Sequence, residues 1–439
     1  MSVRTEDIVL LAWNDLVGMT RVRGVPRSQI ERRMAHGLGW ALAGQALTPF
    51  EDIAPNPWGP VGEVRQVPDP ATETRLDLDL ETPALHFMLC DSLNPDGTPW
   101  ACCTRSFLKA ALADLEKETG LRLRAAFEQE LHLSGPGFVA GPPFSMEAIR
   151  QGARFAGAAV AALRLAGVEP ETFEPEYGVA QFEYACPPVE GVAAADRALI
   201  AREAVREAAR RLGLRASFTP KATPGGVGNG LHIHVSLWDR AGRPMTYDAA
   251  RPAQLSEVAG HFAAGVVRHA RALVALTAPS PVSYLRLGPH HWSSGYTAFG
   301  VQNRECALRV CPPPDKDEAA RARHINLEYR PADATASPYL ALGALVRAGL
   351  EGVRARLPMP QPTEGDPHEL SADARRERGV HPLPTTLAEA LVALEGDAVA
   401  RGWFADEMLT TYLAVKRTEI AAFQDVDAAA MCERYRLAY

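Results

Sequence analysis

The chain has 439 residues, of which 47% are apolar and 23% charged, and its net charge is −7. This length suits two domains, or one large domain with a smaller one attached. The acidic balance argues against a nucleic-acid partner. No apolar run approaches the ~18 residues of a membrane span, and the first residues lack a signal-peptide layout. Seven scattered cysteines form no CxxC pair, which argues against structural zinc and disulfides. We therefore expect a cytoplasmic protein without membrane partners.

Residues 1–104 are expected to form a small N-terminal domain built mainly of strands. Short apolar runs alternate there with Pro and Gly, as at 55–60 and 68–70. The sequence LDLDL at 76–80 alternates strictly between apolar and acidic residues, which predicts a strand. The sequence NPDG at 94–97 predicts a tight turn.

From residue 105 to residue 439 the pattern changes to helices alternating with strands. Apolar periodicity predicts helices at 107–119, 193–212, 256–277, 337–356 and 403–423. Strands are predicted at 121–133, 181–186, 231–237, 297–301, 306–310 and 324–330. The segment 357–385, rich in Pro and charge, is expected to be a surface excursion. This alternation indicates an α/β or α+β body packed around a sheet.

Pairs of chemically potent side chains lie two residues apart within three of these strands. Residues at i and i+2 of a strand point to the same face of a sheet. The pairs are Glu128 and Glu130, His232 and His234, and Glu328 and Arg330, and a further stretch adds Glu176 and Glu183. Five carboxylates cannot share a cavity while ionised unless cations compensate their charge. The pattern therefore predicts a divalent-metal site for phosphoryl transfer.

The acidic pairs also have ordinary structural interpretations. An isolated Glu-x-Glu is more often an exposed strand edge, but the apolar flanks of Glu128 predict burial, and buried acids need partners. Glu176 and Glu183 are seven residues apart, a spacing that a straight strand sends to opposite faces. They converge only if a turn intervenes, which Gly178 permits.

The histidine pair is weighed in the same way. A single histidine would more often be a core residue with a satisfied hydrogen bond. His232 and His234 share their predicted face with Ser236, and they follow a Gly-rich approach at 225–230 that includes Gly228. This combination favours a face that binds a ligand or a metal, although His-x-His alone is only moderately specific.

Arginines recur in the C-terminal half, at Arg286, Arg304, Arg309 and Arg330. Surface arginines usually pair with acids, but Arg309 lies within an apolar run. A guanidinium group binds phosphate or carboxylate oxygens in a fixed fork, as a transferred phosphoryl group would require. The chain has no P-loop, dinucleotide-binding glycine motif, serine-hydrolase elbow or HExxH motif, which excludes those classes.

Six motifs in one order carry a family resemblance. They are Glu128-x-Glu130, Glu176 followed by Gln181-Phe-Glu183, the segment 230–238 (GLHIHVSLW), Ser283-Tyr-Leu-Arg286, Asn303-Arg304 with Arg309, and Glu328-Tyr-Arg330-Pro-Ala-Asp333 followed by Ser337-Pro-Tyr. From roughly residue 85 to the C-terminus, the chain resembles glutamine synthetases and the γ-glutamyl-amine (polyamine-type) ligases.

The resemblance implies an α+β fold, with a small β-grasp-like domain at 1–104 and a catalytic domain at 105–439. In that catalytic domain, helices flank a curved antiparallel sheet. The family assembles as homo-oligomers of stacked rings with active sites between neighbouring subunits. Its implied activity is an ATP-dependent ligase that joins glutamate to an amine through an acyl phosphate, with two or three Mg²⁺ or Mn²⁺ ions per site.

The resemblance also implies a role for each motif residue. One metal ion would be held by Glu130, Glu176 and Glu183, and a second by Glu128, His232 and Glu328. His234 and Ser236 would contact the nucleotide. Arg286 and Arg330 would bind the substrate carboxylate near Gly228, while Arg304 and Arg309 would neutralise the transferred phosphoryl group.

The departures from the family pattern concern the amine. Glutamine synthetases carry a flap Glu that helps to bind and deprotonate ammonium, and here Trp292 occupies that place in GPHHWSSG. The N-terminal Phe-Asp-Gly-Ser signature is absent, Asn326 replaces an arginine, and Ala180 replaces a glycine. We therefore expect an organic amine, with Trp292 contacting its apolar body. An ammonia-using glutamine synthetase and a catalytically silent relative remain the alternatives.

Overall fold

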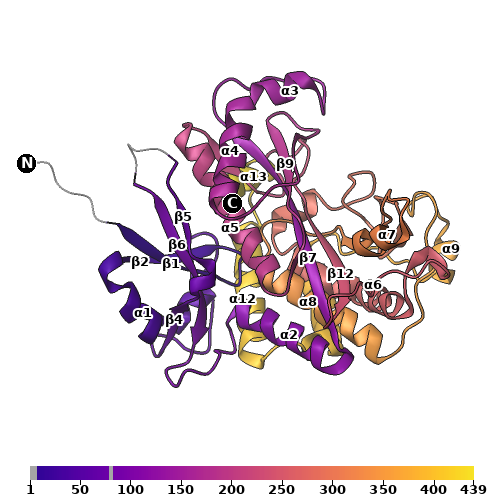
Figure 1. Cartoon of the computed structure of the whole chain (residues 1–439), viewed down its shortest axis with the longest axis horizontal. Helices are drawn as coiled ribbons and strands as arrows, with labels where there is room; N and C mark the ends of the chain where they lie inside the picture. The colour runs from indigo at the N-terminus through magenta and orange to yellow at the C-terminus, as the bar shows by residue number, and fades with distance from the viewer. Residues whose placement is uncertain (1–6, 79–82) are drawn as a thin grey trace, which may run out of the picture.

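The computed structural model describes residues 7–78 and 83–439, and the chain forms two sheets there (Figure 1). The N-terminal sheet is built from β1 (Ile8–Asn14), β2 (Thr20–Pro26), β3 (Leu38–Ala41), β4 (Glu63–Pro68), β5 (Thr74–Leu76) and β6 (Leu85–Leu93). Its strand order is β2-β1-β6-β4-β3, with β5 also paired to β6. The strands β1 and β6 run parallel, and the other pairs are antiparallel. This confirms the expected strand-rich unit, to which helix α1 (Ile30–His36) is added.

The strand predicted at 76–80 is wrong where the structure describes it. Strand β5 ends at Leu76, and residues 77 and 78 belong to no strand. The remainder of the predicted strand lies outside the described residues. Leu76 is fully buried and Arg75 is exposed. The alternation of buried and exposed residues is therefore found in β5 (Thr74–Leu76), before the predicted strand begins its acidic positions.

The second sheet contains the strands that carry the predicted site residues. It is built from β7 (Leu121–Ser134), β8 (Thr172–Pro175), β9 (Gln181–Ala185), β10 (Val189–Glu190), β11 (Arg215–Ser217), β12 (Leu231–Asp239), β13 (Phe299–Val301), β14 (Leu308–Cys311) and β15 (Asn326–Tyr329). The main order is β13-β14-β15-β12-β7-β9-β8, and β10 and β11 also pair with β7. Antiparallel pairing prevails, and β13 runs parallel to β14.

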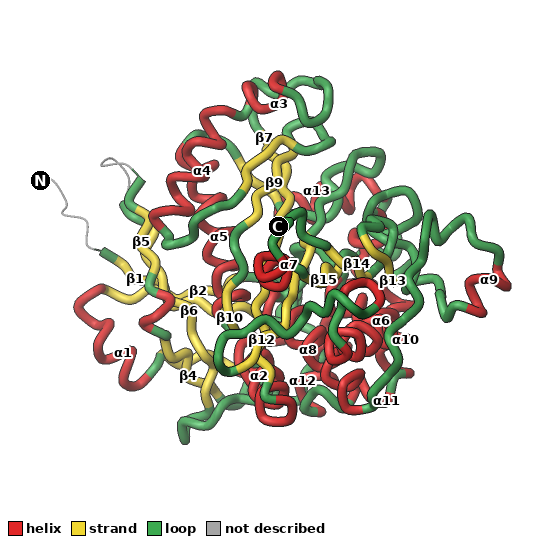
Figure 2. The backbone as a smooth tube through the Cα atoms, turned by 45° about the vertical axis from the view of Figure 1, so that its right-hand side comes forward, coloured by secondary structure: helices red, strands yellow, loops and turns green. Residues whose placement is uncertain are grey.

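Helices pack around this second sheet (Figure 2). They are α2 (Thr104–Thr119), α3 (Met146–Gln151), α4 (Ala153–Leu165), α5 (Ala193–Arg211), α6 (Glu257–Thr277), α7 (Glu318–His324), α8 (Pro338–Arg354), α9 (Ala372–Glu377), α10 (Leu387–Gly396), α11 (Ala398–Arg401), α12 (Asp406–Ala422) and α13 (Ala428–Ala438). The five predicted helices are confirmed within a few residues. The strand predicted at 324–330 starts too early, because His324 ends α7 and β15 begins at Asn326.

Strand β7 shows why the predicted site residues share a face. Along its 14 residues, buried and half-buried positions alternate without a break. Leu123 and Phe127 are on the buried face, in one core with residues of α2 and α5. Burying each such side chain contributes about 1.5–3 kcal/mol, and a slip of one residue would carry Glu128 and Glu130 into that core. The register of β7 therefore directs both acids to the opposite face.

The segment 357–385 is an excursion only in part. It contains α9 and many exposed residues, as expected, but Thr363, Val380 and Leu383 are buried. The Thr363 amide donates to the carbonyl of Phe299 in β13, at 2.7 Å, which ties the segment to the sheet edge. Within 7–78 and 83–439, no helix combines the length and apolarity needed to cross a membrane.

Candidate active site

The register of four neighbouring strands places the predicted residues in rows across one face of the second sheet. His232 of β12 lies opposite Glu128 of β7. One row further along, His234 lies opposite Glu328 of β15, which in turn lies opposite Arg309 of β14. Residues from distant parts of the sequence therefore meet because of strand pairing, and the sheet fixes their spacing.

Two groups of donor atoms form on this face, and both contain Glu128. Ligand atoms of Glu128, Glu183 and His232 lie within 4.8 Å of one another, as do those of Glu128, His234 and Glu328. Glu128 Oε2 is 3.0 Å from His232 Nδ1 and 3.4 Å from His234 Nε2. Carboxylate oxygens with one or two imidazoles form a donor set that suits Mg²⁺ or Mn²⁺.

The pKa shifts on this face reflect crowded negative charge. Burial, together with the nearby charges of Glu128 and Glu130, raises the pKa of Glu183 far above its usual value. Burial likewise raises the pKa of Glu130, against the attraction of Arg286. Burial opposes protonation of His234, but Cys311 and the acidic neighbours raise its pKa well above normal. An excess of negative charge raises the pKa of carboxyl groups and of a neighbouring imidazole alike, because each added proton reduces the repulsion.

His232 of the first group approaches other side chains closely at Gly230. His232 is 6% exposed, and its Nε2 has no hydrogen-bond partner among the described residues. A Cβ atom on Gly230 would lie 2.9 Å from that nitrogen, 2.9 Å from Glu130 Oε1 and 2.7 Å from Arg286 Nη2. The unpaired buried nitrogen of His232 is a donor that a metal ion could use, and Gly230 lets His232, Glu130 and Arg286 approach one another closely.

Two arginines contact the second donor group through its member Glu328. Both Arg309 and Arg330 form ion pairs with the fully buried Glu328. Burial alone would raise the pKa of Glu328, but Arg330, the two histidines and Arg309 lower it to about 2. Arg286 is 3% exposed and donates to the carbonyl of Ala332 at 3.0 Å. These guanidinium groups are therefore positioned beside the donor atoms.

The flap that carries Trp292 is tied to the same arginines. Arg330 Nη2 donates to the carbonyl of Trp292 at 2.7 Å, and Ser293 Oγ donates to that of Arg286 at 2.8 Å. His290, Trp292 and Ser294 all have positive φ, of 64°, 52° and 74°. Non-glycine residues in that conformation are strained and persist only where their surroundings fix them. The Trp292 side chain is 58% exposed, so its ring is free to contact a ligand.

Three predicted site residues lie at the margin of these groups. Glu176 is half-buried and belongs to neither donor group, although its pKa is raised by burial and by nearby acids. The Arg304 side chain is exposed, and its carbonyl accepts from Arg330 Nε at 3.0 Å. Ser236 is buried, and its Oγ accepts from Trp238 Nε1 at 2.9 Å.

Glycine and amide residues complete the face, and the sequence pattern gives little sign of their roles. A Cβ on Gly228 would lie 2.7 Å from Arg286 Cγ, so Gly228 permits the arginine to pass closely. Gln181 Nε2 donates to Glu130 Oε2 at 3.1 Å, to the Gly228 carbonyl at 2.9 Å and to Asn229 Oδ1 at 2.9 Å. In the sequence Gln181 stands out only as part of a motif, and its position near Glu183 on β9 gives no hint of its contact with Glu130.

Comparison with family models identifies the chain. The glutamine synthetase catalytic domain matches residues 101–435, and the glutamine synthetase N-terminal domain matches residues 2–100. The chain belongs to the glutamine synthetase family. It is an α+β protein and an ATP-dependent ligase of the glutamate–amine class, and the family generally uses ATP and divalent metals, as the resemblance implied.

Several relatives match almost the whole chain. It is 34% identical to the γ-glutamylpolyamine synthetase GlnA3 of Streptomyces coelicolor, over 98% of this chain and 93% of that protein. It is 30% identical to a glutamine synthetase of Thermus thermophilus, over 93% and 91% respectively. A crystal structure of a novel glutamine synthase homolog shares 42% identity and a TM-score of 0.92, covering 100% of both chains. A GmaS/ADP complex shares 26% identity and a TM-score of 0.80, covering 95% and 94%.

Proposed function

We propose that this glutamine synthetase family member joins the γ-carboxylate of glutamate to an organic amine at the expense of ATP. The observation that carries the proposal is the convergence, on one face of one sheet, of two donor groups that share Glu128 and of the guanidinium groups around Glu328. This arrangement suits transfer of a phosphoryl group to a carboxylate, which requires divalent cations and fixed positive charge.

The assignment of the metal ligands follows the family resemblance; Glu130 and Glu176 belong to neither donor group, and His232 and Glu328 belong to different ones. We assign Glu130, Glu176 and Glu183 to an ion near the substrate, and Glu128, His232 and Glu328 to an ion near the ATP phosphates. The unpaired buried Nε2 of His232 supports an ion at this end of the face. When bound, such ions neutralise phosphate oxygens and align the reacting groups. Oxygen-rich ligands favour Mg²⁺ or Mn²⁺.

The chain's own residues account for the rest of the chemistry. Arg286 and Arg330 bind and orient the carboxylates of glutamate, and Arg304 and Arg309 stabilise charge on the transferred phosphoryl group. The γ-carboxylate oxygen attacks the γ-phosphorus of ATP, which forms an acyl phosphate and releases ADP. The amine nitrogen then attacks the acyl carbon, phosphate leaves, and the ammonium proton passes to a base. His234 and Ser236 face the nucleotide, and the flap excludes water that would hydrolyse the acyl phosphate.

The flap supports an organic amine as the acceptor. Trp292 occupies the position where glutamine synthetases carry a carboxylate that binds ammonium. Its ring is largely exposed, and its backbone carbonyl accepts a hydrogen bond from Arg330. A desolvated ammonium ion needs a carboxylate, whereas an alkyl amine gains contact area from an aromatic ring. The name of the GlnA3 relative, a γ-glutamylpolyamine synthetase, supports the same class of acceptor.

The proposed assembly is a homo-oligomer of stacked rings. Exposed large apolar residues gather in segments that flank the candidate site: Val139, Phe144, Met146, Tyr177 and Val179. Apolar surface of this kind, next to a functional face, is typical of a contact with another chain. Sedimentation equilibrium tests this proposal: we expect a mass several times the 47.4 kDa of one chain, and a monomer at all concentrations would contradict it.

Phosphate release tests the proposed reaction. The purified protein is given ATP, Mg²⁺ and glutamate, together with ammonium, monoamines, diamines, polyamines or ethanolamine in parallel. We expect release that depends on glutamate and Mg²⁺ and is fastest with one class of organic amine. Turnover with ammonium as efficient as with any organic amine would instead indicate a glutamine synthetase. No release under any condition would indicate a silent relative or a different acid substrate.

A further inference from the structure

A buried arginine lies behind the second sheet, on the side covered by helix α5. Arg202 belongs to α5 and is 1% exposed. Burial and the neighbouring charge of Arg206 lower the pKa of Arg202 to about 10, so its guanidinium group still carries its proton at neutral pH. Among the residues that the structure describes, no carboxylate lies within ion-pair distance of it. The ring of Phe218, whose centre is 5.7 Å from Cζ, compensates the charge only in part. A buried charge without a counter-ion lowers stability, so the fold alone does not account for this residue.

The hydrogen bonds of Arg202 go to uncharged groups on two segments of the candidate site. Its Nε donates to Gln129 Oε1 at 3.3 Å, and its Nη1 donates to the carbonyl of Ala334 at 3.1 Å. Gln129 lies on β7 between Glu128 and Glu130 and faces the opposite side of the sheet. Ala334 lies in the loop that follows β15. One planar guanidinium group therefore contacts both segments from behind the sheet.

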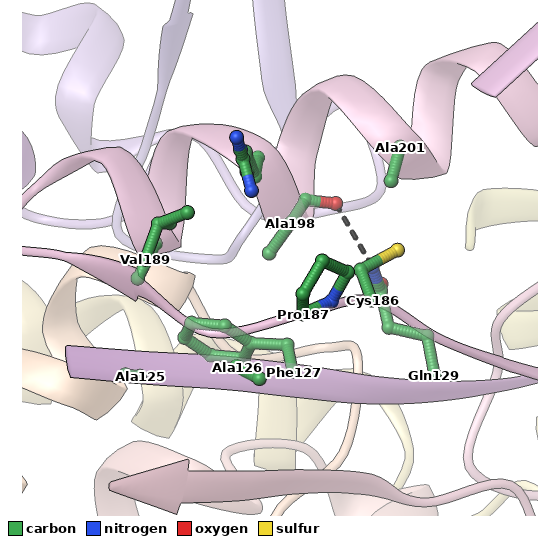
Figure 3. Close-up of a pocket in the computed structure, with 11 residues that line it drawn as sticks. Ala125, Ala126, Phe127, Gln129, Cys186, Pro187, Val189, Ala198 and Ala201 are labelled. Carbon is green, nitrogen blue, oxygen red and sulfur yellow. Dashed lines mark hydrogen bonds between the residues drawn. The ribbon is translucent and has the colours of Figure 1, made fainter. Parts of the chain in front are cut away.

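The contact with Gln129 holds β7 against the helix layer. Pairing with neighbouring strands positions β7 within the sheet, whereas contacts with α5 position it in the perpendicular direction. Gln129 is 1% exposed, and its Nε2 donates to the carbonyl of Ala198 in α5 at 3.0 Å (Figure 3). Its Oε1 accepts from Arg202 of the same helix. Both polar groups of this buried amide are thus satisfied by α5, and the strand that projects Glu128 and Glu130 is fixed from its rear face.

The contact with Ala334 acts on the loop that orients Arg286. Residues 331–337 follow β15, belong to no strand and are all buried. The carbonyl of Ala332, two residues before Ala334, accepts from Arg286 Nη1 at 3.0 Å. A loop lacks the regular hydrogen bonds of a strand, so its position depends on individual contacts of this kind. Arg202 supplies one such contact.

We infer that Arg202 is a positioning residue for the proposed reaction: it holds the acids of β7 and the loop that orients Arg286 in one arrangement. Fully satisfied contacts between buried polar groups select a single packing of the elements that they join. The inference rests on the proposed roles of Glu130 and Arg286. Because Mn²⁺ binding is measured without ATP or turnover, it tests the contact with β7 even if the ligase proposal fails.

Two variants of the full-length protein separate the two contacts. Isothermal titration gives the Mn²⁺ affinity, and phosphate-release kinetics give the KM for glutamate. We expect Arg202→Met to weaken Mn²⁺ binding about tenfold and to raise the KM for glutamate about tenfold, because both contacts are lost. Gln129→Leu should weaken Mn²⁺ binding to a similar extent. It should change the KM for glutamate by less than about threefold, because the contact of Arg202 with Ala334 is retained.

Arg206→Met is the matched control. Arg206 lies one turn further along α5, and its Cζ is 5.3 Å from the centre of the same Phe218 ring. It donates to Glu203 at 2.9 Å and to the carbonyl of Tyr439 at 2.6 Å, and neither belongs to the candidate site. Arg206→Met should therefore change the Mn²⁺ affinity and the KM for glutamate by less than about twofold.

Thermal denaturation separates positioning from general destabilisation. We expect Arg202→Met to change Tm by less than about 3 °C, because removal of an uncompensated buried charge offsets the lost hydrogen bonds. Wild-type Mn²⁺ affinity and KM for glutamate in Arg202→Met would overturn the inference, as would equal losses in Arg206→Met. If Arg202→Met fails to fold, Gln129→Leu provides the test, and an unchanged Mn²⁺ affinity in that variant would overturn the inference.

Discussion

At the scale of single residues, Glu128 connects the two donor groups. Its Oε2 contacts both histidines, and burial is outweighed by those hydrogen bonds, so its pKa lies well below the usual value. Glu128 is therefore ionised while its neighbour Glu183 tends to hold a proton. Glu128, which both donor groups use, therefore stays charged without metal, as does Glu328.

Replacing this shared ligand should abolish activity without unfolding the protein. We expect Glu128→Gln to lower kcat by more than about 100-fold, because an amide is a poor metal ligand. The control is Glu190→Gln, an exposed acid on β10, which also pairs with β7. Phosphate-release kinetics and circular dichroism measure the two effects. Activity of Glu128→Gln within about threefold of the control would show that the metal assignment is wrong.

The close approach of side chains to Gly230 permits a second residue-scale prediction. A methyl group there would lie within 2.9 Å of His232 Nε2 and of Glu130 Oε1. We expect Gly230→Ala to weaken Mn²⁺ binding at least about tenfold, because the added methyl group would displace the side chains of His232 and Glu130. Gly225→Ala is the control in the same Gly-rich approach, since a Cβ there has nothing within 4 Å. Isothermal titration with Mn²⁺ compares them, and equal affinities would place the ion elsewhere.

At the scale of elements, one turn determines whether Glu176 and Glu183 converge. The Glu176 amide donates to the carbonyl of Gln181 at 2.9 Å, which closes a tight turn between β8 and β9. The sequence points to Gly178 as the residue that permits the turn, but the positive φ, of 55°, belongs to Ala180. The glycine that the family carries before Gln181 would adopt this conformation without strain. The alanine adopts it at a cost in stability.

Restoring the glycine should therefore stabilise the protein. We expect Ala180→Gly to raise the free energy of unfolding by about 0.5–1 kcal/mol, because relief of left-handed strain exceeds the added chain entropy. The control, Ala185→Gly at the other end of β9, should lower it by about 0.5–1 kcal/mol, because glycine weakens a regular strand. Urea unfolding monitored by fluorescence measures both. A destabilised Ala180→Gly variant would contradict the proposed strain.

The strands that carry the site are predictable because their patterns are local. The alternation along 121–133 is sufficient to assign Glu128 and Glu130 to one face of their strand, and that along 231–237 assigns His232 and His234 to one face of theirs. Pairing between strands is not encoded in that periodicity, so the meeting of Cys311, Asn326 and His234 follows only from the register of β12, β15 and β14. Helix α3 escapes prediction because it has only six residues, and Gly152 separates it from α4, where small side chains make the sequence less distinctive.

At the scale of the whole molecule, stability and metal binding should be linked through pH. In the metal-free fold, burial and neighbouring acids raise the pKa values of Glu183 and Glu130. Above the unfolded pKa of about 4.3, the folded state then binds more protons than the unfolded chain, so stability falls as pH rises toward the folded values. A bound cation removes this penalty, because it stabilises the ionised carboxylates.

We therefore expect the increase in Tm on adding Mg²⁺ to be larger at about pH 8 than at about pH 6. At the higher pH, ionisation of the buried carboxylates destabilises the metal-free fold more, so a bound cation restores more stability. Thermal denaturation in chelator and in excess Mg²⁺, across this range, provides the measurement. A metal-induced shift that shrinks as the pH rises would be inconsistent with carboxylates that are protonated in the metal-free site.

Selection of the acceptor is the claim that distinguishes this chain from glutamine synthetases. Loss of the Trp292 ring should lower kcat/KM for the preferred organic amine about tenfold, which corresponds to one aromatic contact of roughly 1–1.5 kcal/mol. The KM values for ATP and glutamate should not change in Trp292→Ala, because Arg286 and the donor groups are intact. An equal loss for ammonium and for the organic amine would show that the ring supports the flap without contacting the acceptor.

The most direct measurement is a competition between acceptors in one reaction. The protein receives ATP, Mg²⁺, glutamate and equal concentrations of ammonium and of the organic amine most active in phosphate release, and mass spectrometry quantifies both products. We predict that the γ-glutamyl amide of the organic amine predominates over glutamine. A product dominated by glutamine would contradict the proposed function and identify the chain as an ammonia-using glutamine synthetase.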